Sequence, residues 1–245
     1  MNKTHRDGTI AVGSLDLYCP AGTTTVLVGP SGCGKTTALR MVNRMVDPTA
    51  GVVSIDGADV ANLEPVALRR SIGYAMQSSG LLPHRTVWQN VATVLRLEGM
   101  DRRTARARAI ELMDTVGLKL TLADRYPHQL SGGQQQRVGV ARALASNPNI
   151  LLMDEPFGAI DPLVRAELQQ ELLRLQRELT KTILFVTHDI GEAFLLGDQV
   201  VVLRDHAEIA QQGTPREIID SPADEFVERF VQIATAGISP RERAR

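Results

Sequence analysis

The segment GPSGCGKTT, residues 29–37, constrains the fold of this 245-residue chain more than any other stretch. It fits G-x-x-x-x-G-K-S/T completely, follows the apolar run TTTVLVG, and precedes a helical pattern from Lys35 to about Val46. Glycines let successive backbone N–H groups converge on phosphate oxygens, Lys35 adds a positive charge, and the Thr36 hydroxyl can ligate Mg²⁺. The sequence therefore predicts a phosphate-binding loop between a strand and a helix. Its residues are Gly29, Pro30, Ser31, Gly32, Cys33, Gly34, Lys35, Thr36 and Thr37.

Strand-like and helix-like segments alternate along the chain. IGYAMQ, NILLMDEP and TILFVTH have strand character, and GVVSIDGADV suggests a hairpin turning at Asp56-Gly57. From Thr86 to about Ala145 the pattern is nearly all helical. We therefore expect an α/β fold, with a mostly parallel sheet covered on both faces and an inserted helical subdomain.

Composition narrows the function classes. The formal net charge is -1, and the four arginines between residues 102 and 108 spread over two helical turns without interleaved aromatic residues. A solvated helix face accounts for Arg102, Arg103, Arg106 and Arg108 better than a nucleic-acid site does. Two cysteines, Cys19 and Cys33, favour a reduced, cytosolic setting. Apolar runs are strand-sized, so we expect a chain that neither spans a membrane nor is exported.

Two carboxylates follow the apolar run ILLM. A buried strand would place Asp154 and Glu155 at its carboxyl end, where open α/β sheets bind their ligands. Asp154 is then expected on the Mg²⁺ side, and Glu155 is positioned to polarise the water that attacks a γ-phosphate. His188 similarly follows the run TILFVT, although a histidine there suits a structural role as well as a catalytic one.

The segment LSGGQQQRVGVARAL, residues 130–144, is a second anion-seeking element. A Ser-Gly-Gly turn opening a helix offers backbone N–H groups to an anion. One folded copy of the chain gives this second element no obvious ligand.

Six features occur in order along the chain: GPSGCGKTT, Gln77 after GYAM, LSGGQQQR, ILLMDEP, GAIDP and THD. With them, roughly residues 8–232 resemble the nucleotide-binding subunit of an ATP-binding cassette transporter. LSGGQ separates this family from other phosphate-loop ATPases. The chain is most similar to importers of osmoprotectants such as glycine betaine, choline or carnitine; an importer of amino acids or polyamines is the alternative. A soluble cassette ATPase of DNA repair or translation is disfavoured by the short span between the phosphate loop and LSGG and by the single cassette. A small-molecule kinase does not explain LSGGQ.

The resemblance implies ATP and Mg²⁺ as cofactors and assigns roles to individual residues. Gln77 would reach Mg²⁺ and the attacking water, Asp154 would support Mg²⁺, and Glu155 would be the general base. His188 would contact the γ-phosphate, and Asp161 in GAIDP would lie at the interface between two copies. The signature residues would act on the ATP held by the other copy; they are Ser131, Gly132, Gly133 and Gln134.

The resemblance also implies an organisation and a set of partners. Residues 1–232 would form one ATPase domain, with a RecA-like core and antiparallel β subdomain in 1–77 and 146–232 and a helical subdomain in 78–145, followed by a disordered tail at 233–245. The partners would be a second copy, membrane permease subunits docking at Gln77–His84 and a separate substrate-binding protein, without nucleic acid. Leu81, Leu82 and Pro83 would suit that docking if exposed; otherwise they pack internally. The location would be cytoplasmic, on the inner face of the membrane.

Two departures from the family pattern stand out. The family usually has an aromatic residue near the N-terminus that stacks on adenine, and no Tyr, Phe or Trp lies near Gly8. His5 is a weak substitute for it, and Tyr18 is expected in the following strand segment in a structural role. This sequence also ends without the regulatory domains that many osmoprotectant importers append, so if transport is osmotically gated, the sensor would lie elsewhere or be minimal.

Overall fold

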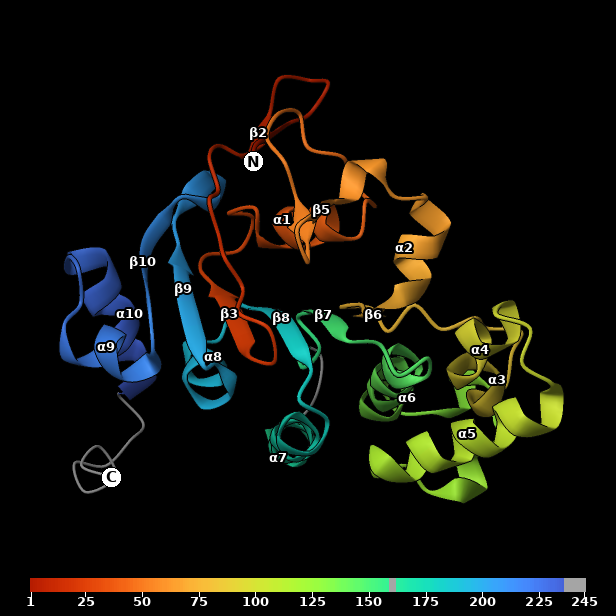
Figure 1. Cartoon of the computed structure of the whole chain (residues 1–245). Helices are drawn as coiled ribbons and strands as arrows, with labels where there is room; N and C mark the ends of the chain where they lie inside the picture. Colours follow the sequence, from red (N-terminus) through yellow and green to blue (C-terminus); the bar gives the residue numbers. More distant parts are fainter. Residues whose placement is uncertain (159–161, 236–245) are drawn as a thin grey trace. The chain divides into compact units, whose positions relative to one another are not determined.

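The computed structural model describes residues 1–158 and 162–235 (Figure 1). The chain divides into two compact units, one formed by Met1–Leu63 with the segment from Leu184 onward, and the other by Glu64–Ile183. Each unit is described by itself.

The first unit is built on a mixed sheet. Its strands follow the order β10-β9-β3-β8, with β3 and β9 parallel and β10 antiparallel to β9. Val26 and Val28 pair with Val200 and Val202, and all four side chains are fully buried. Strands buried on both faces need such continuous apolar runs, which is why TTTVLVG and QVVVL form the centre of this unit. Its strands are β1 (Lys3–Thr4), β2 (Ile10–Val12), β3 (Thr24–Val28), β4 (Ser54–Ile55), β5 (Ala58–Asp59), β8 (Thr182–Thr187, of which residues 184–187 belong to this unit), β9 (Gln199–Leu203) and β10 (Ile209–Gly213).

Helices of the first unit pack against this sheet and against one another. α8 lies on β3, α10 contacts α8, and α9 contacts β10. The hairpin β4–β5 turns at Asp56 and Gly57, both at positive φ, which confirms the predicted Asp-Gly turn. The helices are α1 (Lys35–Val42), α8 (Ile190–Leu196), α9 (Pro215–Asp220) and α10 (Glu225–Thr235), with 3₁₀ turns η1 (Val60–Asn62) and η4 (Asp205–Ala207).

Helix α1 ends earlier than its sequence predicts. The pattern suggested a helix to about Val46, but α1 stops at Val42. Arg44 adopts a left-handed φ of 54°, and its guanidinium donates to the carbonyls of Val60, Ala61 and Leu63. These contacts to a later segment stabilise a chain reversal that local propensity does not encode.

The second unit combines two parallel strands with a group of helices. β6 and β7 pair in register from Ile72 opposite Ile150 to Ala75 opposite Met153, as the apolar runs predict. Helix α6 packs on β6 and contacts α3, α5 and α7. The elements are α2 (Pro65–Ser71), β6 (Ile72–Ala75), α3 (Val87–Val91), α4 (Thr93–Leu97), α5 (Arg102–Thr115), η2 (Leu120–Leu122), η3 (Pro127–Gln129), α6 (Gly132–Leu144), β7 (Ile150–Asp154) and α7 (Pro162–Leu179).

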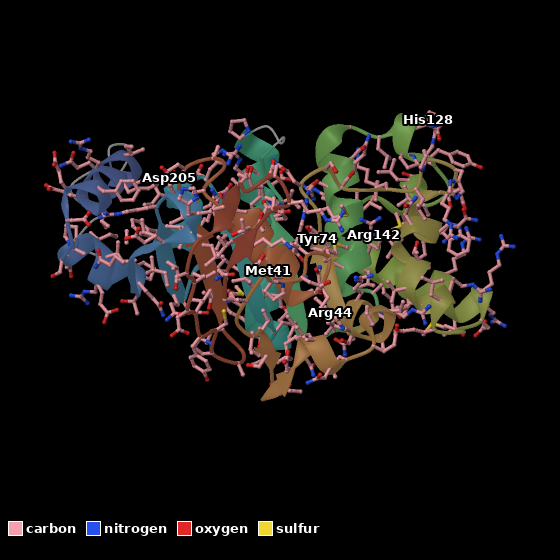
Figure 2. The ribbon with its side chains drawn as sticks, turned by 90° about the horizontal axis from the view of Figure 1, so that it is seen from above. Met41, Arg44, Tyr74, His128, Arg142 and Asp205 are labelled. Carbon is pink, nitrogen blue, oxygen red and sulfur yellow. The ribbon has the colours of Figure 1, made fainter. Side chains whose placement is uncertain are left out.

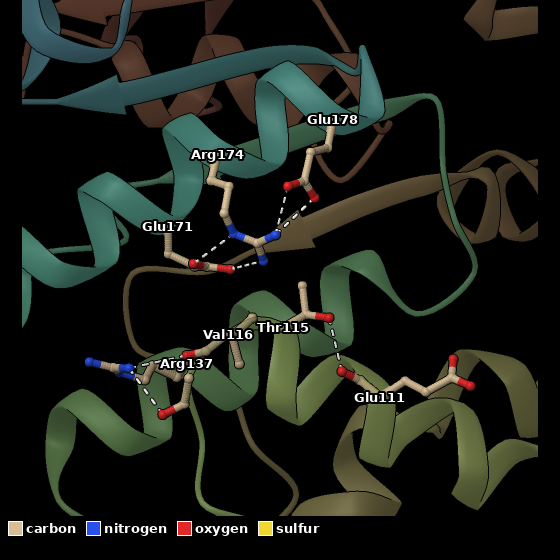
Figure 3. Close-up of polar contacts among 8 residues, drawn as sticks. Glu111, Thr115, Val116, Arg137, Glu171, Arg174 and Glu178 are labelled. Carbon is tan, nitrogen blue, oxygen red and sulfur yellow. Dashed lines mark hydrogen bonds and ion pairs between the residues drawn. The ribbon is translucent and has the colours of Figure 1, made fainter.

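Helix α5 shows how this unit forms its core. Its buried residues Ala105, Ala109, Leu112 and Met113 recur at helical spacing, while Arg102 and Arg106 stay exposed. Figure 3 shows Arg137 of α6 donating to the Val116 carbonyl at the end of α5, and Arg174 of α7 holding both Glu171 and Glu178. The Arg137 contact thus joins α6 to the end of α5, whereas the Arg174 pairs lie within α7 itself.

The four arginines expected on a solvated face lie mainly there. Arg102, Arg103 and Arg106 are exposed and Arg108 is half-buried. Arg106 pairs with Asp124 and Arg108 with Glu111. The Trp88 ring lies beneath the guanidinium groups of Arg102 and Arg106, an aromatic contact that α5 alone did not predict.

Helix α10 extends to Thr235, so residues 233–235 of the predicted tail are helical. Both cysteines are free thiols, as predicted. Within the described residues, none of the helices combines the length and apolarity that crossing a bilayer requires.

Candidate functional site

The phosphate loop of the first unit is shaped by its glycines. Gly34, the residue before α1, has φ +107°, and a Cβ there would lie 2.2 Å from the Ala11 carbonyl oxygen. Only glycine fits that backbone. The Cys33 carbonyl accepts a hydrogen bond from the Ala207 N–H at 2.6 Å. The predicted order of strand, loop and helix is confirmed, and the loop backbone is held at Cys33 by the Ala207 N–H.

Lys35 lies inside this loop. Its side chain is 4% exposed, and Nζ donates to the carbonyls of Gly29 at 2.8 Å and Pro30 at 2.7 Å. A buried ammonium group needs such acceptors. The positive charge expected to meet phosphate is therefore held at the start of the loop by the loop's own backbone.

His188 directly follows the buried strand β8 in the first unit. Thr187 is 2% exposed, whereas His188 is exposed to solvent. Asp189 then caps α8 by accepting the Glu192 N–H at 3.2 Å. The imidazole thus projects from a short junction between a buried strand and a capped helix.

In the second unit, the paired carboxylates lie at the end of β7. Asp154 is fully buried, and the Tyr74 hydroxyl donates to its Oδ2 at 3.1 Å. Gln77 Nε2 donates to Glu155 Oε2 at 3.1 Å. Glu155 has φ 45°, in the left-handed region that non-glycine residues rarely adopt. The structure therefore brings Gln77, Asp154 and Glu155 to one strand end, with Glu155 held in a costly conformation.

Helix α6 holds the chain on both sides of Gln77. Gln136 Nε2 donates to the Met76 carbonyl at 3.2 Å. The Arg142 guanidinium donates to the carbonyls of Ser79 at 2.5 Å and Gly80 at 2.7 Å. Burial lowers the pKa of Arg142. Figure 2 labels Tyr74 and Arg142, which lie on β6 and α6 of this unit. The segment after β6 is thus fixed at three carbonyls by the helix that LSGGQ opens.

The start of α6 is itself a capping box. Ser131 Oγ accepts from the Gln134 N–H at 3.3 Å, and Gln134 Oε1 accepts from the Ser131 N–H at 3.0 Å. Ser131 and Gly132 are exposed, and Gly133 is half-buried. The signature residues form an exposed helix N-terminus in which Ser131 and Gln134 also bond to each other.

The segment expected to dock a permease is anchored near its end by hydrogen bonds to Asn90. Asn90, fully buried, accepts from the Leu82 N–H and donates to the carbonyls of Leu82, Arg85 and Thr86. Leu81 and Leu82 are half-buried, while Pro83 and His84 are exposed. Beside it lies a cavity of about 460 Å³. The residues lining this cavity are Arg85, Trp88, Gln89, Thr93, Arg96, Leu97 and Arg102.

The donor set suits Mg²⁺ chemically. Asp154 offers a carboxylate, Thr36 a hydroxyl and Gln77 an amide oxygen, the hard oxygen ligands that Mg²⁺ binds together with water and phosphates. The part of the chain that the structure describes has no cluster of three or more His, Cys, Asp or Glu side chains, so a cage formed by protein carboxylates alone does not occur there. Asp161, expected at an interface between copies, lies outside the described residues.

The N-terminal expectations need one correction. Tyr18 was expected in a strand and in a structural role, but residues 14–20 belong to no strand and Tyr18 is 75% exposed. The backbone of this stretch pairs elsewhere, since the Leu15 N–H donates to the Met1 carbonyl. His5 is exposed at the turn between β1 and β2, where its N–H donates to the Thr9 carbonyl at 2.8 Å.

With this geometry established, comparison with known proteins defines the class. Residues 12–158 match the sequence model described as ABC transporter, and the chain belongs to that family. Its fold is the α/β phosphate-loop fold of ATP-binding cassettes. The dimeric cassette MJ0796 bound to ADP and Pi aligns with a TM-score of 0.81 and 36% identity, covering 88% of this chain and 96% of that one. CbiO1 of Clostridium perfringens, part of the transporter complex cbiONQ, gives a TM-score of 0.81 and 29% identity, covering 98% of this chain and 93% of that chain.

Several similar curated proteins are ATP-binding proteins of choline, carnitine or glycine betaine transport. The choline transport ATP-binding protein OpuBA of Bacillus subtilis is 49% identical over 94% of this chain and 60% of its own length. The glycine betaine/carnitine/choline transport ATP-binding protein OpuCA of the same organism is 50% identical over 94% of this chain and 60% of its own length. The glycine betaine uptake system ATP-binding protein YehX of Escherichia coli is 50% identical over 93% of this chain and 74% of its own length. The chain thus spans about 60% of the length of the first two relatives.

Sequence reasoning missed the residues that hold the predicted site residues. Tyr74 donates a hydrogen bond to a residue 80 positions away in the sequence, and Gln136 donates to one 60 positions away. Arg142 donates to residues 62 and 63 positions away. Only for Gln136 did the sequence contain a signal. It is a polar residue at a core-facing position of a largely apolar helix face, and a buried polar side chain usually has a specific hydrogen-bond partner.

Proposed function

We propose that this chain is the ATP-hydrolysing subunit of an importer that carries osmoprotectants of the quaternary-ammonium class. The observation that carries the proposal is the end of β7, where a buried Asp154 precedes a strained Glu155 whose carboxylate is held by the Gln77 amide. Backbone strain of this kind concentrates at functional sites. The phosphate loop around Lys35 supplies the complementary binding chemistry.

Each residue then has a defined task. The loop from Gly29 to Thr37 binds the triphosphate, with Lys35 leaving its carbonyl acceptors for phosphate oxygens. Thr36, Asp154 and Gln77 would hold Mg²⁺, which would supply positive charge to offset that of the bound phosphates. Glu155 accepts a proton from the attacking water, and Gln77 orients that water.

Two copies complete the site. The γ-phosphate bound by one copy is contacted by the signature residues of the other copy, which are Ser131, Gly132, Gly133 and Gln134. His188 contacts the same γ-phosphate. Asp161 lies at the interface between the copies. The dimeric state of the MJ0796 cassette supports this arrangement. Binding of two ATP molecules then coincides with closure of the dimer, and hydrolysis reopens it.

The membrane partner is a pair of permease subunits, served by a separate substrate-binding protein. The segment Gln77–His84 docks the permease, a role supported by the exposed Pro83 and His84 and by the hydrogen bonds that Asn90 makes with Leu82. Three arginines line the neighbouring cavity, which favours an acidic docking segment. The chain is accordingly peripheral on the cytoplasmic face of the membrane. Residues 1–77 and 146–232 form its catalytic core with the β subdomain, and 78–145 form the helical subdomain.

Adenine is the least constrained part of the nucleotide in this proposal. His5 is its stacking partner, and it supplies a smaller ring than tyrosine or tryptophan. We therefore expect ATP and GTP to be hydrolysed with rates that differ by less than about fivefold, since weak stacking gives little discrimination.

The direct test uses Glu155→Gln, which keeps the shape of the side chain and removes the base. Turnover should fall by about 100-fold or more while ATP affinity stays within about threefold, and the variant should accumulate as a dimer with Mg-ATP. Glu98→Gln, at an exposed position, is the matched control and should behave as wild type. A Glu155→Gln chain that hydrolyses ATP at the wild-type rate contradicts the proposed mechanism.

The cargo is tested separately. The chain is reconstituted with the permease that co-purifies with it and with the binding protein, and ATP hydrolysis is measured with betaine, choline, carnitine, proline or a polyamine. Stimulation by quaternary amines supports the cargo. Stimulation only by an amino acid or a polyamine would contradict the cargo and leave the ATPase role intact.

A further inference from the structure

Glu192 is a buried carboxylate to which the proposed chemistry assigns no task. Its side chain is 5% exposed, and Thr187 Oγ1 donates to Glu192 Oε2 at 2.6 Å. Burying a carboxylate is costly unless it is hydrogen-bonded, and this distance is typical of an O–H···O⁻ bond. The first turn of α8 needs no buried acid at this position in order to be helical. A specific use for the carboxylate is therefore expected.

The bond belongs to a local network of hydrogen bonds. The Asp189 N–H donates to Thr187 Oγ1 at 3.0 Å, and Asp189 Oδ1 accepts from the Glu192 N–H at 3.2 Å. The Thr187 hydroxyl thus donates to Glu192 and accepts from Asp189 at once. Together these three bonds fix the residue before His188 and the residue after it.

His188 is the exposed residue inside this network. Thr187 ends the buried strand β8, and Asp189 caps α8, which packs on β3 and α10. Ordering the backbone of such a junction costs conformational entropy, which hydrogen bonds from neighbouring side chains help to offset. The network restrains the backbone on both sides of His188, and His188 itself is exposed.

We propose that Thr187 and Glu192 are positioning residues that hold His188 in the orientation needed to contact the γ-phosphate. The inference rests on the proposed role of His188 in hydrolysis. Neither Thr187 nor Glu192 touches the nucleotide; both act through the backbone on either side of His188. Misplacing a reacting group by about 1 Å costs up to about 100-fold in rate, so a partial loss of this restraint has a measurable effect.

The experiment uses three variants of the full chain. Thr187→Val keeps the shape and removes the hydroxyl, Thr187→Ser keeps the hydroxyl, and Glu192→Gln removes the charge. Thr187→Val and Glu192→Gln should lower kcat about tenfold with KM for ATP within about twofold, and Thr187→Ser should restore kcat to within about twofold of wild type. Thr24→Val is the matched control, because Thr24 is also buried on a strand of this unit and its hydroxyl has no hydrogen-bond partner among the described residues.

A double-mutant cycle distinguishes positioning from a general structural role. In a His188→Ala background, Thr187→Val should change the residual single-turnover rate by less than about twofold, because the residue through which it acts is gone. A tenfold loss that persists in that background would overturn the inference, as would unchanged kcat for Thr187→Val in the wild-type chain. Wild-type kcat for His188→Ala itself would instead overturn the proposed role of His188, and this inference with it. Melting temperatures of all variants identify any that fail to fold.

Discussion

Two helices of this protein begin at glycine-rich segments, and they begin differently. Helix α1 starts after Gly34, a residue at φ +107° with no side chain to cap the helix, and Lys35 bonds back to the loop carbonyls. Helix α6 starts at Ser131, where a capping box with Gln134 uses the hydroxyl and the amide of the signature itself. An anion at the start of α1 therefore does not compete with a side-chain cap. At the start of α6, some of the backbone N–H groups are already bonded by the side chains of the capping box.

This difference predicts different roles for the starts of α1 and α6 in ATP binding. The α1 loop combines a glycine backbone with a lysine and can bind phosphate by itself. The α6 start has its N-cap and N3 amides bonded, so it contributes mainly its first-turn amides and its dipole to an anion that another element holds. We therefore expect damage at α1 to abolish binding and damage at α6 to affect a later step.

The largest effect is expected at the phosphate loop. Lys35→Ala removes the charge that meets the phosphates and should weaken ATP binding by about 100-fold or more, because charge-assisted phosphate contacts are strong. Titration with a fluorescent ATP analogue measures the change. Lys119→Ala, at an exposed lysine, is the control and should bind normally. Unchanged affinity for Lys35→Ala would refute the assignment of the loop.

The second effect separates the two helix starts. Gly133→Asp places a carboxylate at the α6 N-terminus, where it favours the helix dipole but repels a γ-phosphate. Turnover should fall by about 100-fold while ATP affinity of the monomer and the melting temperature stay unchanged. Gly133→Ala, which adds no charge, should lose less activity. If Gly133→Asp weakened ATP binding by the isolated chain as much as Lys35→Ala does, the proposed difference between the starts of α1 and α6 would be contradicted.

A smaller effect is expected at the support of Asp154. Tyr74→Phe removes a hydrogen bond to a fully buried carboxylate and should lower the free energy of unfolding by about 1–2 kcal/mol. The concentration of Mg²⁺ needed for half-maximal turnover should also change, since the orientation of Asp154 loses a restraint. Urea unfolding and a Mg²⁺ titration measure the two effects. Tyr126→Phe, at an exposed tyrosine, should alter neither quantity.

The smallest effect concerns the capping box. Ser131→Ala should lower the free energy of unfolding by about 1 kcal/mol, because an N-cap hydroxyl is lost. Thermal unfolding followed by circular dichroism detects this loss, and Ser131→Asn, which retains a side-chain oxygen, should recover most of it. Equal stability of wild type and Ser131→Ala would show that the box contributes nothing to α6.

These contrasts also show where sequence reasoning succeeds. Local chemistry encodes the phosphate loop, the turn at Asp56-Gly57 and the strand that ends at Asp154, and all three are present as predicted. Each depends on residues within a few positions of one another, so spacing alone is sufficient.

Contacts across long separations were not predictable in this way. The bond from Tyr74 to Asp154 joins residues 80 positions apart, and the end of α1 depends on Arg44 reaching carbonyls 16 to 19 positions away. The left-handed φ of Glu155 was likewise not predictable, since local propensity disfavours it for a glutamate. Tertiary structure therefore decides how the site residues are held, although their identities are visible in the sequence.

The central claim is that each ATP is shared between the phosphate loop of one copy and the α6 start of the other. A mixture of Lys35→Ala and Gly133→Asp chains, both also carrying Glu155→Gln, tests it most directly. Neither chain alone has an intact shared site, but a mixed dimer has one, formed by the loop of the Gly133→Asp chain and the signature of the Lys35→Ala chain. With Mg-ATP, sedimentation of the mixture should give a dimer that retains one ATP, while each chain alone stays monomeric. A mixture that stays monomeric at concentrations where Glu155→Gln alone dimerises would contradict the account.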